Sequence, residues 1–310
     1  MREYHEPVLL DEVMAALRPE KGSRFLDATL GGGGHTRALL KEGTQVLGLD
    51  QDRDALEEAE RWGSHEENLA LVQTNFRHLG ELLQEIGCGP FDGMLFDLGV
   101  SSHQLDEAER GFSFQQEGPL DMRMNQGGNL TAYDVVNHYE EDGLVTILRD
   151  YGEEPHAVRL AKAIARRRQR GAIETTLELA GLVEEVVPKR GKRHPATRAF
   201  QAIRMEVNDE LGSVKAGLEN AIRWIRPGGR LAVITFHSLE DRLVKRFLRS
   251  RSEKWIDRPE WPAPRPNPDY CLDLKPRRGI VAQAEEVKRN PRARSARLRV
   301  AEIESSGLLA

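Results

Sequence analysis

Apolar and polar positions alternate along residues 24–97 in a way that predicts strands separated by helices. Four short apolar runs have the length and composition of buried strands, at residues 24–29, 45–50, 69–73 and 91–97. Amphipathic segments at residues 36–42, 53–62 and 79–86 lie between them and predict helices. Strand–helix alternation with short loops is typical of right-handed crossovers and a parallel, doubly wound α/β sheet.

The alternation stops after the fourth run, and residues 105–215 contain no convincing strand. Residues 131–134 and 175–178 have the pattern of capping boxes at helix starts. Apolar residues from Leu177 to Val187 follow helical spacing. We therefore expect an all-α domain, residues 105–215, inserted into an α/β domain formed by residues 1–104 and 216–310.

The α/β pattern resumes after this insertion. A helix ending near Arg226, a strand at residues 230–236 and a helix at residues 239–248 are expected. Five prolines in residues 258–268 predict a segment without regular structure. Residues 297–303 alternate basic and apolar positions, which predicts a late edge strand, and residues 305–310 are expected to fray.

Composition supports a folded intracellular protein. Apolar residues make up 39% and charged residues 31% of the 310 residues, enough for a core and too apolar for a disordered chain. Two cysteines cannot build a disulfide framework, and neither a membrane span nor a signal peptide is visible, so a cytoplasmic location is expected. No metal-ligand spacing stands out.

The net charge of −5 is divided unevenly along the chain. Residues 1–150 hold 29 acidic and 12 basic residues, whereas residues 151–310 hold 21 and 33. Basic clusters occur at residues 166–170, 189–193 and 291–294. This split favours contact between the second half and a nucleic acid, although a solvated helical surface would also produce such clusters.

A glycine cluster follows the first expected strand, between Asp27 and Thr36. Glycines 31–34 let the backbone turn tightly and approach a ligand, with a helix N-terminus behind them. Asp50 ends the next strand, where a carboxylate binds the ribose of an adenosine-type cofactor. The dinucleotide fingerprint lacks its third glycine, which disfavours a nicotinamide cofactor; a tight turn without a ligand is the other alternative.

Two further positions follow strand ends. Asp97 is expected to face the ligand crevice, although aspartate is also a common cap residue. Phe76 is a candidate for packing on an adenine face or, equally, in the core.

Several longer motifs together resemble one family. They are HEPVLLDE at residues 5–12, GGGGH at 31–35, DLGVSS at 97–102, ERGFSF at 109–114, GPLDMRM at 118–124, HPATR at 194–198, FHSLEDR at 236–242 and NPRARS at 290–295. In this order and over nearly the whole chain, they resemble the bacterial 16S ribosomal RNA cytosine-N4 methyltransferases, which are class I S-adenosylmethionine-dependent enzymes.

The resemblance implies roles for individual residues. The cofactor S-adenosyl-L-methionine would be contacted at its methionine end by Gly33, Gly34 and His35. Its ribose would be held by Asp50 and its adenine flanked by Phe76, while Asp97 and Gln104 would complete the pocket. The resemblance also implies as substrate a cytidine in the decoding region of small-subunit ribosomal RNA, either free or in the assembled subunit. The oligomeric state stays open.

The residues favour attack by an exocyclic amine over attack at ring carbon C5. The C5 route needs a cysteine nucleophile, and neither Cys88 nor Cys271 follows an expected strand that faces the cofactor. For the amine route, Asp97 is the expected catalytic residue, as an orienting acceptor or base.

The remaining catalytic candidate is His237, which is expected to contact the target nucleotide or to make a structural hydrogen bond. The aromatic partner of the target base would be Phe112, Phe114 or His237, and the base must be unstacked to react. A nicotinamide-dependent oxidoreductase and a non-enzymatic RNA-binding assembly factor are the alternatives.

Overall fold

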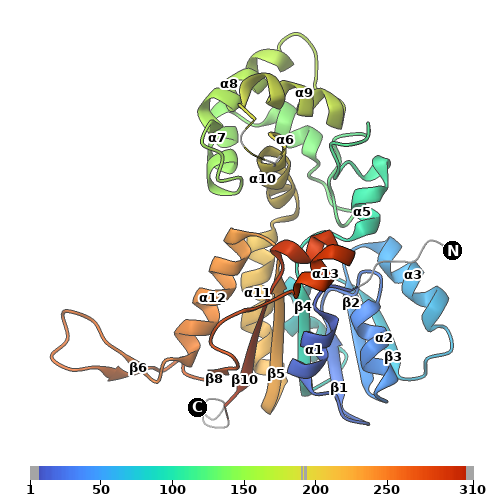
Figure 1. The fold of residues 1–310 in the computed structure, drawn as a ribbon, viewed down its shortest axis with the longest axis vertical. Helices are drawn as coiled ribbons and strands as arrows, with labels where there is room; N and C mark the ends of the chain where they lie inside the picture. The colour runs from blue at the N-terminus through green and yellow to red at the C-terminus, as the bar shows by residue number, and fades with distance from the viewer. Residues whose placement is uncertain (1–6, 190, 192–193, 305–310) are drawn as a thin grey trace. The chain divides into compact units, whose positions relative to one another are not determined.

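The computed structural model describes residues 7–189, 191 and 194–304. The chain forms two compact units, a sheet unit of Met1–Gly99 with Leu211–Ala310 and a helical unit of Val100–Glu210 (Figure 1). Each boundary between the two units lies five residues before the corresponding expected domain boundary. The start of the motif at residues 5–12, most of the basic cluster at residues 189–193 and residues 305–310 lie outside the described residues.

The sheet unit is built on one mixed sheet with the order β3-β2-β1-β4-β5-β10-β8, and β9 pairs with β10. Its strands are β1 (Arg24–Asp27), β2 (Gln45–Asp50), β3 (Leu69–Gln73), β4 (Phe91–Asp97), β5 (Ile225–Thr235), β8 (Leu272–Leu274), β9 (Ile280–Val281) and β10 (Arg297–Ile303). The first five strands pair in parallel, which confirms the α/β class with a doubly wound sheet. The strand order reverses between β1 and β4.

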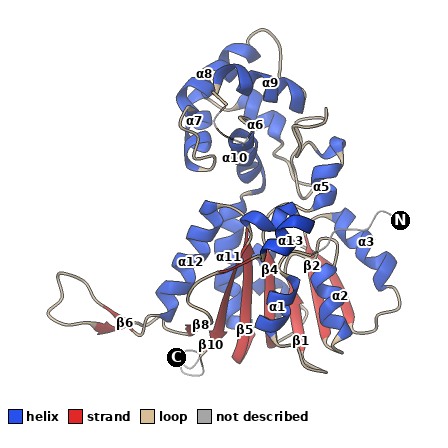
Figure 2. Cartoon of the chain, viewed as in Figure 1, coloured by secondary structure: helices blue, strands red, loops and turns tan. Residues whose placement is uncertain are grey.

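Helices cover both faces of this sheet (Figure 2). The helical segments are α1 (Leu10–Leu17), α2 (Gly34–Lys41), α3 (Arg53–Gly63), η1 (Phe76–His78), α4 (Leu79–Glu85), α11 (Glu210–Trp224), α12 (Ser238–Ser252), α13 (Ala284–Arg289) and η3 (Pro291–Ser295). α1 and α2 pack apolar residues on one face, and α4, α11 and α12 pack on the other. Each face thereby removes a continuous apolar layer from water, the main driving force for this architecture.

The structure corrects the expected edge strand and the expected irregular loop. β10 is antiparallel to β5 and is covered on its other side by β8 and β9, so it lies inside the sheet. The proline-rich segment contributes β7 (Arg265–Pro266) to a two-stranded ribbon with β6 (Trp255–Ile256). Proline is compatible with a strand of such a ribbon because the only backbone hydrogen-bonding group that it lacks is the N–H donor.

The helical unit contains no strand among its described residues, as expected. It consists of α5 (Ser102–Asp106), η2 (Ala108–Arg110), α6 (Ala132–His138), α7 (Glu141–Asp150), α8 (Ala157–Arg168), α9 (Thr176–Val186) and α10 (Thr197–Asn208). Both expected capping boxes are confirmed, at the starts of α6 and α9. Val100 and Leu105 pack against this unit's apolar core, which explains why the unit begins before residue 105.

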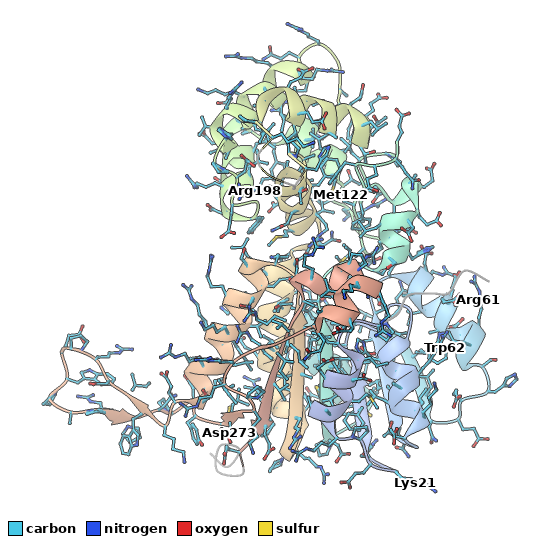
Figure 3. The ribbon with its side chains drawn as sticks, in the orientation of Figure 1. Lys21, Arg61, Trp62, Met122, Arg198 and Asp273 are labelled. Carbon is cyan, nitrogen blue, oxygen red and sulfur yellow. The ribbon has the colours of Figure 1, made fainter. Side chains whose placement is uncertain are left out.

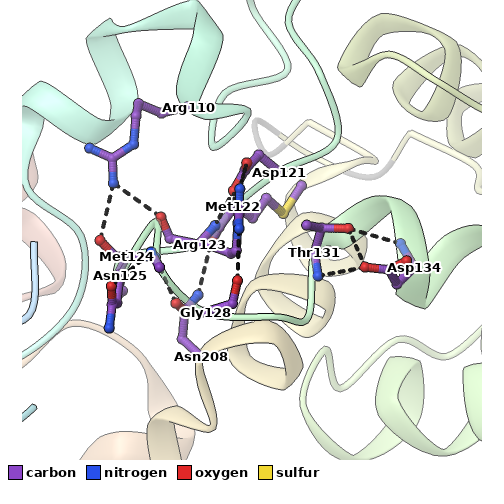
Figure 4. A network of polar contacts seen from close by, with 11 residues as sticks. Arg110, Asp121, Met122, Arg123, Met124, Asn125, Gly128, Thr131, Asp134 and Asn208 are labelled. Carbon is purple, nitrogen blue, oxygen red and sulfur yellow. Dashed lines mark hydrogen bonds and ion pairs between the residues drawn. The ribbon is translucent and has the colours of Figure 1, made fainter.

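A loop in the helical unit is held by buried polar contacts (Figure 4). The Arg110 guanidinium donates to the carbonyls of Arg123 and Met124 at 3.0 and 3.2 Å. Asn208 of α10 accepts from the Met124 N–H at 2.8 Å and donates to the Met122 carbonyl at 2.8 Å. These side chains supply hydrogen-bond partners for backbone groups that lie outside helices and strands. They therefore fix the loop between η2 and α6, although it has no regular secondary structure.

No helix in the described parts of the chain is both long and apolar enough to cross a membrane.

Candidate functional site

Acidic side chains gather at the carboxyl edge of the sheet unit, around the point where the strand order reverses. Asp27 ends β1, Asp50 ends β2 and Asp97 ends β4. In open α/β sheets, ligands bind in the crevice beyond these strand ends. The sequence therefore brings three carboxylates to the edge where a ligand is expected.

The glycine cluster forms the turn from β1 into α2. Gly31 and Gly33 have φ of +50° and +74°, a region in which side chains with a Cβ are strained. A Cβ on Gly33 would lie 2.2 Å from the ring of Trp62, an α3 residue labelled in Figure 3. Trp62 thus packs against the turn, and only glycine fits at residue 33. α2 then begins at Gly34, so its first N–H groups lie at this edge.

Asp50 is tied to the glycine turn by backbone hydrogen bonds. Its Oδ2 accepts from the Gly31 N–H at 2.8 Å and its Oδ1 from the Asp52 N–H at 2.9 Å. Burial, with smaller effects from the charges of Asp52 and Asp27, raises the pKa of Asp50 to about 6. Each carboxylate oxygen has a second lone pair, so Asp50 retains the capacity to accept hydrogen bonds from a diol.

Asp97 is oriented by Thr29, whose hydroxyl oxygen accepts the Asp97 N–H at 2.6 Å. Its buried Oδ1 has no hydrogen-bond partner in the described chain. Burial raises the pKa of Asp97 well above its ordinary value, and the charges of Asp27 and Glu240 raise it further. A buried oxygen without a hydrogen-bond partner lowers the stability of a folded protein. Because Asp97 Oδ1 lies at the edge of the sheet where a ligand is expected, it is a candidate functional atom.

His35, in the first turn of α2, is a neutral neighbour of Asp97. Its Nε2 donates to the Val8 carbonyl at 3.0 Å, and its Nδ1 lies 3.7 Å from Asp97 Oδ2. Burial lowers the pKa of His35 to about 4. The ring is therefore uncharged near neutral pH and does not offset the raised pKa of Asp97.

Asp27 is a site residue to which the sequence gave no role of its own. It is 1% exposed, and its two oxygens accept from the Thr36 hydroxyl at 2.7 Å and the Thr29 N–H at 3.2 Å. Burial raises its pKa to about 6. Asp27 therefore holds the residues on both sides of the glycine turn, Thr29 before it and Thr36 after it. Its position at the end of the first strand, before the glycine cluster, was the sequence signal for this role.

His237 follows β5 and is the N-cap of α12. Its Nδ1 accepts from the Glu240 N–H at 3.4 Å, and Glu240 Oε2 accepts from the Phe236 and His237 N–H groups. His237 Nε2 is 3.0 Å from Glu240 Oε1 but lacks hydrogen-bond geometry there and has no other partner in the described chain. The structural hydrogen bond is thus present, and the His237 Nε2–H has no hydrogen-bond partner among the residues that the structure describes.

The remaining candidates are packed in different ways. Phe76, in η1, contacts Phe96 edge-on with ring centroids 5.4 Å apart, so it has the expected core contact. Gln104 belongs to the helical unit, where its side chain completes a capping box with Ser101. Phe112 is 5% exposed within the helical core, which argues against it as a stacking partner for a base. Phe114 is stacked on His194, with centroids 4.6 Å apart.

Neither cysteine has the environment of a nucleophile. Cys88 lies just before β4, at the amino end of the strand that carries Asp97 at its carboxyl end. Burial raises the pKa of the Cys271 thiol, which disfavours the reactive thiolate. These positions agree with the expectation that neither cysteine serves as the nucleophile of a C5 reaction.

The carboxylate-rich edge suits a cationic ligand that also carries hydroxyl donors. Burial raises the pKa values of Asp50 and Asp97, with smaller contributions from the charges of other carboxylates nearby, so a positive charge close to them would stabilise their ionised forms. S-adenosylmethionine has a sulfonium, an ammonium and a ribose diol, which match these acceptors. The residues at this edge therefore fit that cofactor.

Comparison with known proteins gives matches over nearly the whole chain. A family model described as the MraW methylase family matches residues 2–304. The chain is 45% identical over 303 residues to the ribosomal RNA small subunit methyltransferase H of Symbiobacterium thermophilum, covering 96% of this chain and 95% of that relative. It is 48% identical over 299 residues to the protein of the same name from Deinococcus deserti, covering 96% and 93%. Among solved structures, an rRNA methylase from Streptococcus thermophilus aligns with a TM-score of 0.42 at 12% identity, over 96% of this chain and 94% of that chain.

Proposed function

The chain belongs to the MraW methylase family, and we propose that it transfers a methyl group from S-adenosylmethionine to the exocyclic N4 amine of a cytidine in 16S ribosomal RNA. Relatives covering more than nine tenths of the chain are named as ribosomal RNA small subunit methyltransferases, which supports this substrate. Membership in a methylase family sets aside the nicotinamide-dependent oxidoreductase. A bacterial enzyme acting on ribosomal RNA would work in the cytoplasm.

The observation that carries the proposal is the free acceptor on Asp97. Its Oδ1 is buried without a hydrogen-bond partner in the described chain, at the strand end beside the glycine turn. An exocyclic amine offers N–H donors, and one of them would satisfy this oxygen. C5 methylation would instead need a nucleophilic thiolate, and neither cysteine has a suitable environment.

In this mechanism Asp97 orients the amine and receives its proton. The bound cofactor supplies an electrophilic methyl group on its sulfonium sulfur. Asp97 Oδ1 would accept a hydrogen bond from N4–H, which would orient the amine and draw its nitrogen lone pair out of conjugation with the ring. Asp97 Oδ1 would also take the proton that N4 loses when it gains the methyl group. The raised pKa of Asp97 makes it a stronger base for this step.

Other residues are proposed to hold the reactants. Asp50 would accept the ribose hydroxyls, and the glycine turn through Gly33 and Gly34 would admit the methionine end. His35 would contribute its neutral ring at the same place. Phe76 and Gln104 are proposed as further cofactor contacts.

The target nucleotide needs contacts of its own. The Nε2–H of His237 would donate to it, since this group has no hydrogen-bond partner in the described chain. The helical unit is proposed to recognise the substrate RNA, as free 16S RNA or in the assembled small subunit.

Methyl transfer from S-adenosylmethionine labelled in its methyl group tests the proposal. The acceptors are 16S RNA and small subunits from cells lacking the modification, and the variants are Asp97→Asn and, as a matched control, Asp142→Asn on the exposed surface of α7. We expect label in RNA with the wild type and the control, and little with Asp97→Asn. If the wild type binds the cofactor yet labels neither acceptor, the ribosomal substrate is wrong. Cofactor-independent RNA binding alone would favour an assembly factor.

A further inference from the structure

One face of α8 in the helical unit carries a row of cations. Arg159, Lys162 and Arg166 are all exposed, and their spacing of three and four residues places them one above another on the helix. They span about 10 Å of helix at 1.5 Å per residue. The opposite face of α8, with Leu160 and Ile164, is buried in the core of the unit.

These three cations have no carboxylate partner among the described residues, whereas their neighbours on α8 do have acceptors. Arg167 donates to the Gly171 carbonyl at 2.9 Å and pairs with Glu178 at 3.4 Å. Arg168 donates to the Val136 carbonyl at 3.0 Å. Within the basic cluster at residues 166–170, Arg167 and Arg168 therefore make contacts inside the helical unit. Arg166 belongs instead to the row of cations without a carboxylate partner among the described residues.

The unpaired row borders a surface hollow of about 560 Å³, here called the α8 groove. The three cations line this hollow together with the apolar side chains of Val158, Ala163 and Val186. Val158 is 54% exposed, so an apolar side chain lies at the surface beside these cations. The α8 groove thus combines apolar side chains with a line of cations that are not neutralised within the described chain.

We propose that the α8 groove binds the phosphate backbone of the substrate RNA, with sugars or bases against its apolar side chains. This inference rests on the proposed function, since it assumes an RNA substrate. Like charges at helical spacings of three and four residues repel each other, and this repulsion is relieved when a polyanion binds. A single phosphate is too small to contact a row about 10 Å long, whereas successive phosphates of one strand extend along it.

The test uses the full-length protein and three variants with small-subunit particles lacking the modification. The groove variant is Arg159→Gln with Lys162→Gln and Arg166→Gln. The matched control removes the same charges from residues that are exposed and ion-paired, with Arg149→Gln, Arg226→Gln and Lys275→Gln. The rescue variant keeps the charge, with Arg159→Lys, Lys162→Arg and Arg166→Lys. KM, kcat, cofactor affinity and thermal unfolding are measured for each, with KM at several salt concentrations.

We expect the groove variant to raise KM for the particle between about 10- and 100-fold at about 0.1 M salt, with kcat and cofactor affinity unchanged. Losing three phosphate contacts should also make the slope of log affinity against log salt shallower by about 2. The control and rescue variants should behave like the wild type.

The outcomes separate this inference from the proposed function. Wild-type methyl transfer to RNA together with an unchanged KM and slope in the groove variant would refute the α8 groove alone, and an acidic protein partner would then be the better occupant. Absence of wild-type methyl transfer would refute the proposed function instead. Equal losses in the groove and control variants would show only a general charge effect and would likewise overturn the α8 groove.

Discussion

Cofactor affinity should fall about tenfold when the pH is lowered from 7 to 5, because Asp50 then gains a proton. A carboxylate accepts hydrogen bonds from both ribose hydroxyls, whereas a protonated acid loses part of this capacity. Burial raises the pKa of Asp50 to about 6, so the change falls in an accessible range. The sign follows from the ionised form being the binding form: affinity is full above the pKa and lost as the pH falls through it.

The size of this effect follows from the fraction of Asp50 that is ionised. With a pKa of about 6, roughly one tenth is ionised at pH 5 and roughly nine tenths at pH 7. Apparent affinity scales with the competent fraction, which gives a factor of about ten, or about 1.4 kcal/mol. The cofactor's own amino group titrates near pH 8 and does not disturb this window.

Isothermal titration calorimetry of S-adenosylmethionine at pH 5, 6 and 7 measures the effect. In Asp50→Asn, affinity should be lower and the change in affinity between pH 7 and pH 5 should be clearly smaller than in the wild type. In Asp27→Asn, the midpoint should move to lower pH because the Asp27 charge helps to raise the pKa of Asp50. Urea unfolding at each pH verifies that the protein is folded. A flat profile in the wild type, or the same tenfold change in Asp50→Asn, would show that ionised Asp50 does not hold the cofactor.

Substitutions at three other residues of the candidate site give distinct outcomes. Gly33→Ala should cost at least about 2 kcal/mol in urea unfolding, because residue 33 has φ +74° and a Cβ would lie 2.2 Å from Trp62; Gly181→Ala in α9, where nothing lies within 4 Å, should not destabilise. Asp97→Asn should keep the fold while kcat at saturating cofactor falls about 100-fold or more, and a kcat near wild type would remove Asp97 from the mechanism. His237→Ala should lower stability by about 1 kcal/mol through loss of the cap, whereas His237→Asn should restore stability but not turnover; full turnover in His237→Asn would leave residue 237 with a structural role only.

Strand positions and the acidic strand ends could be predicted from the sequence because both depend on local pattern. The bounds of β2, β3 and β4 agree with the expected runs, since buried parallel strands are continuous apolar segments. Asp50 and Asp97 end their strands as expected. Their meeting at one edge follows from parallel pairing, which the alternation of strands and helices already implied.

Other features depend on contacts between distant residues and left no local signal. The alternation in residues 297–303 indicates a strand but does not identify its partners. One of them, β8, comes from a separate segment of the chain. Trp62 packs on Gly33 from another helix. The neutral state of His35 depends on the Val8 carbonyl and on burial, neither of which a sequence pattern specifies. α1 was missed because its eight residues form too short a pattern.

In the proposed reaction the protein methylates N4 of a cytidine in 16S ribosomal RNA. This reaction is tested by nucleoside mass spectrometry of small-subunit RNA from cells lacking the modification, after incubation with the protein and S-adenosylmethionine. Synthetic N4-methylcytidine and 5-methylcytidine serve as standards, because the two isomers have equal mass and are separated by retention and fragmentation. We expect new N4-methylcytidine with the wild type and none with Asp97→Asn. New 5-methylcytidine, or no methylated cytidine from a protein that binds the cofactor, would contradict it.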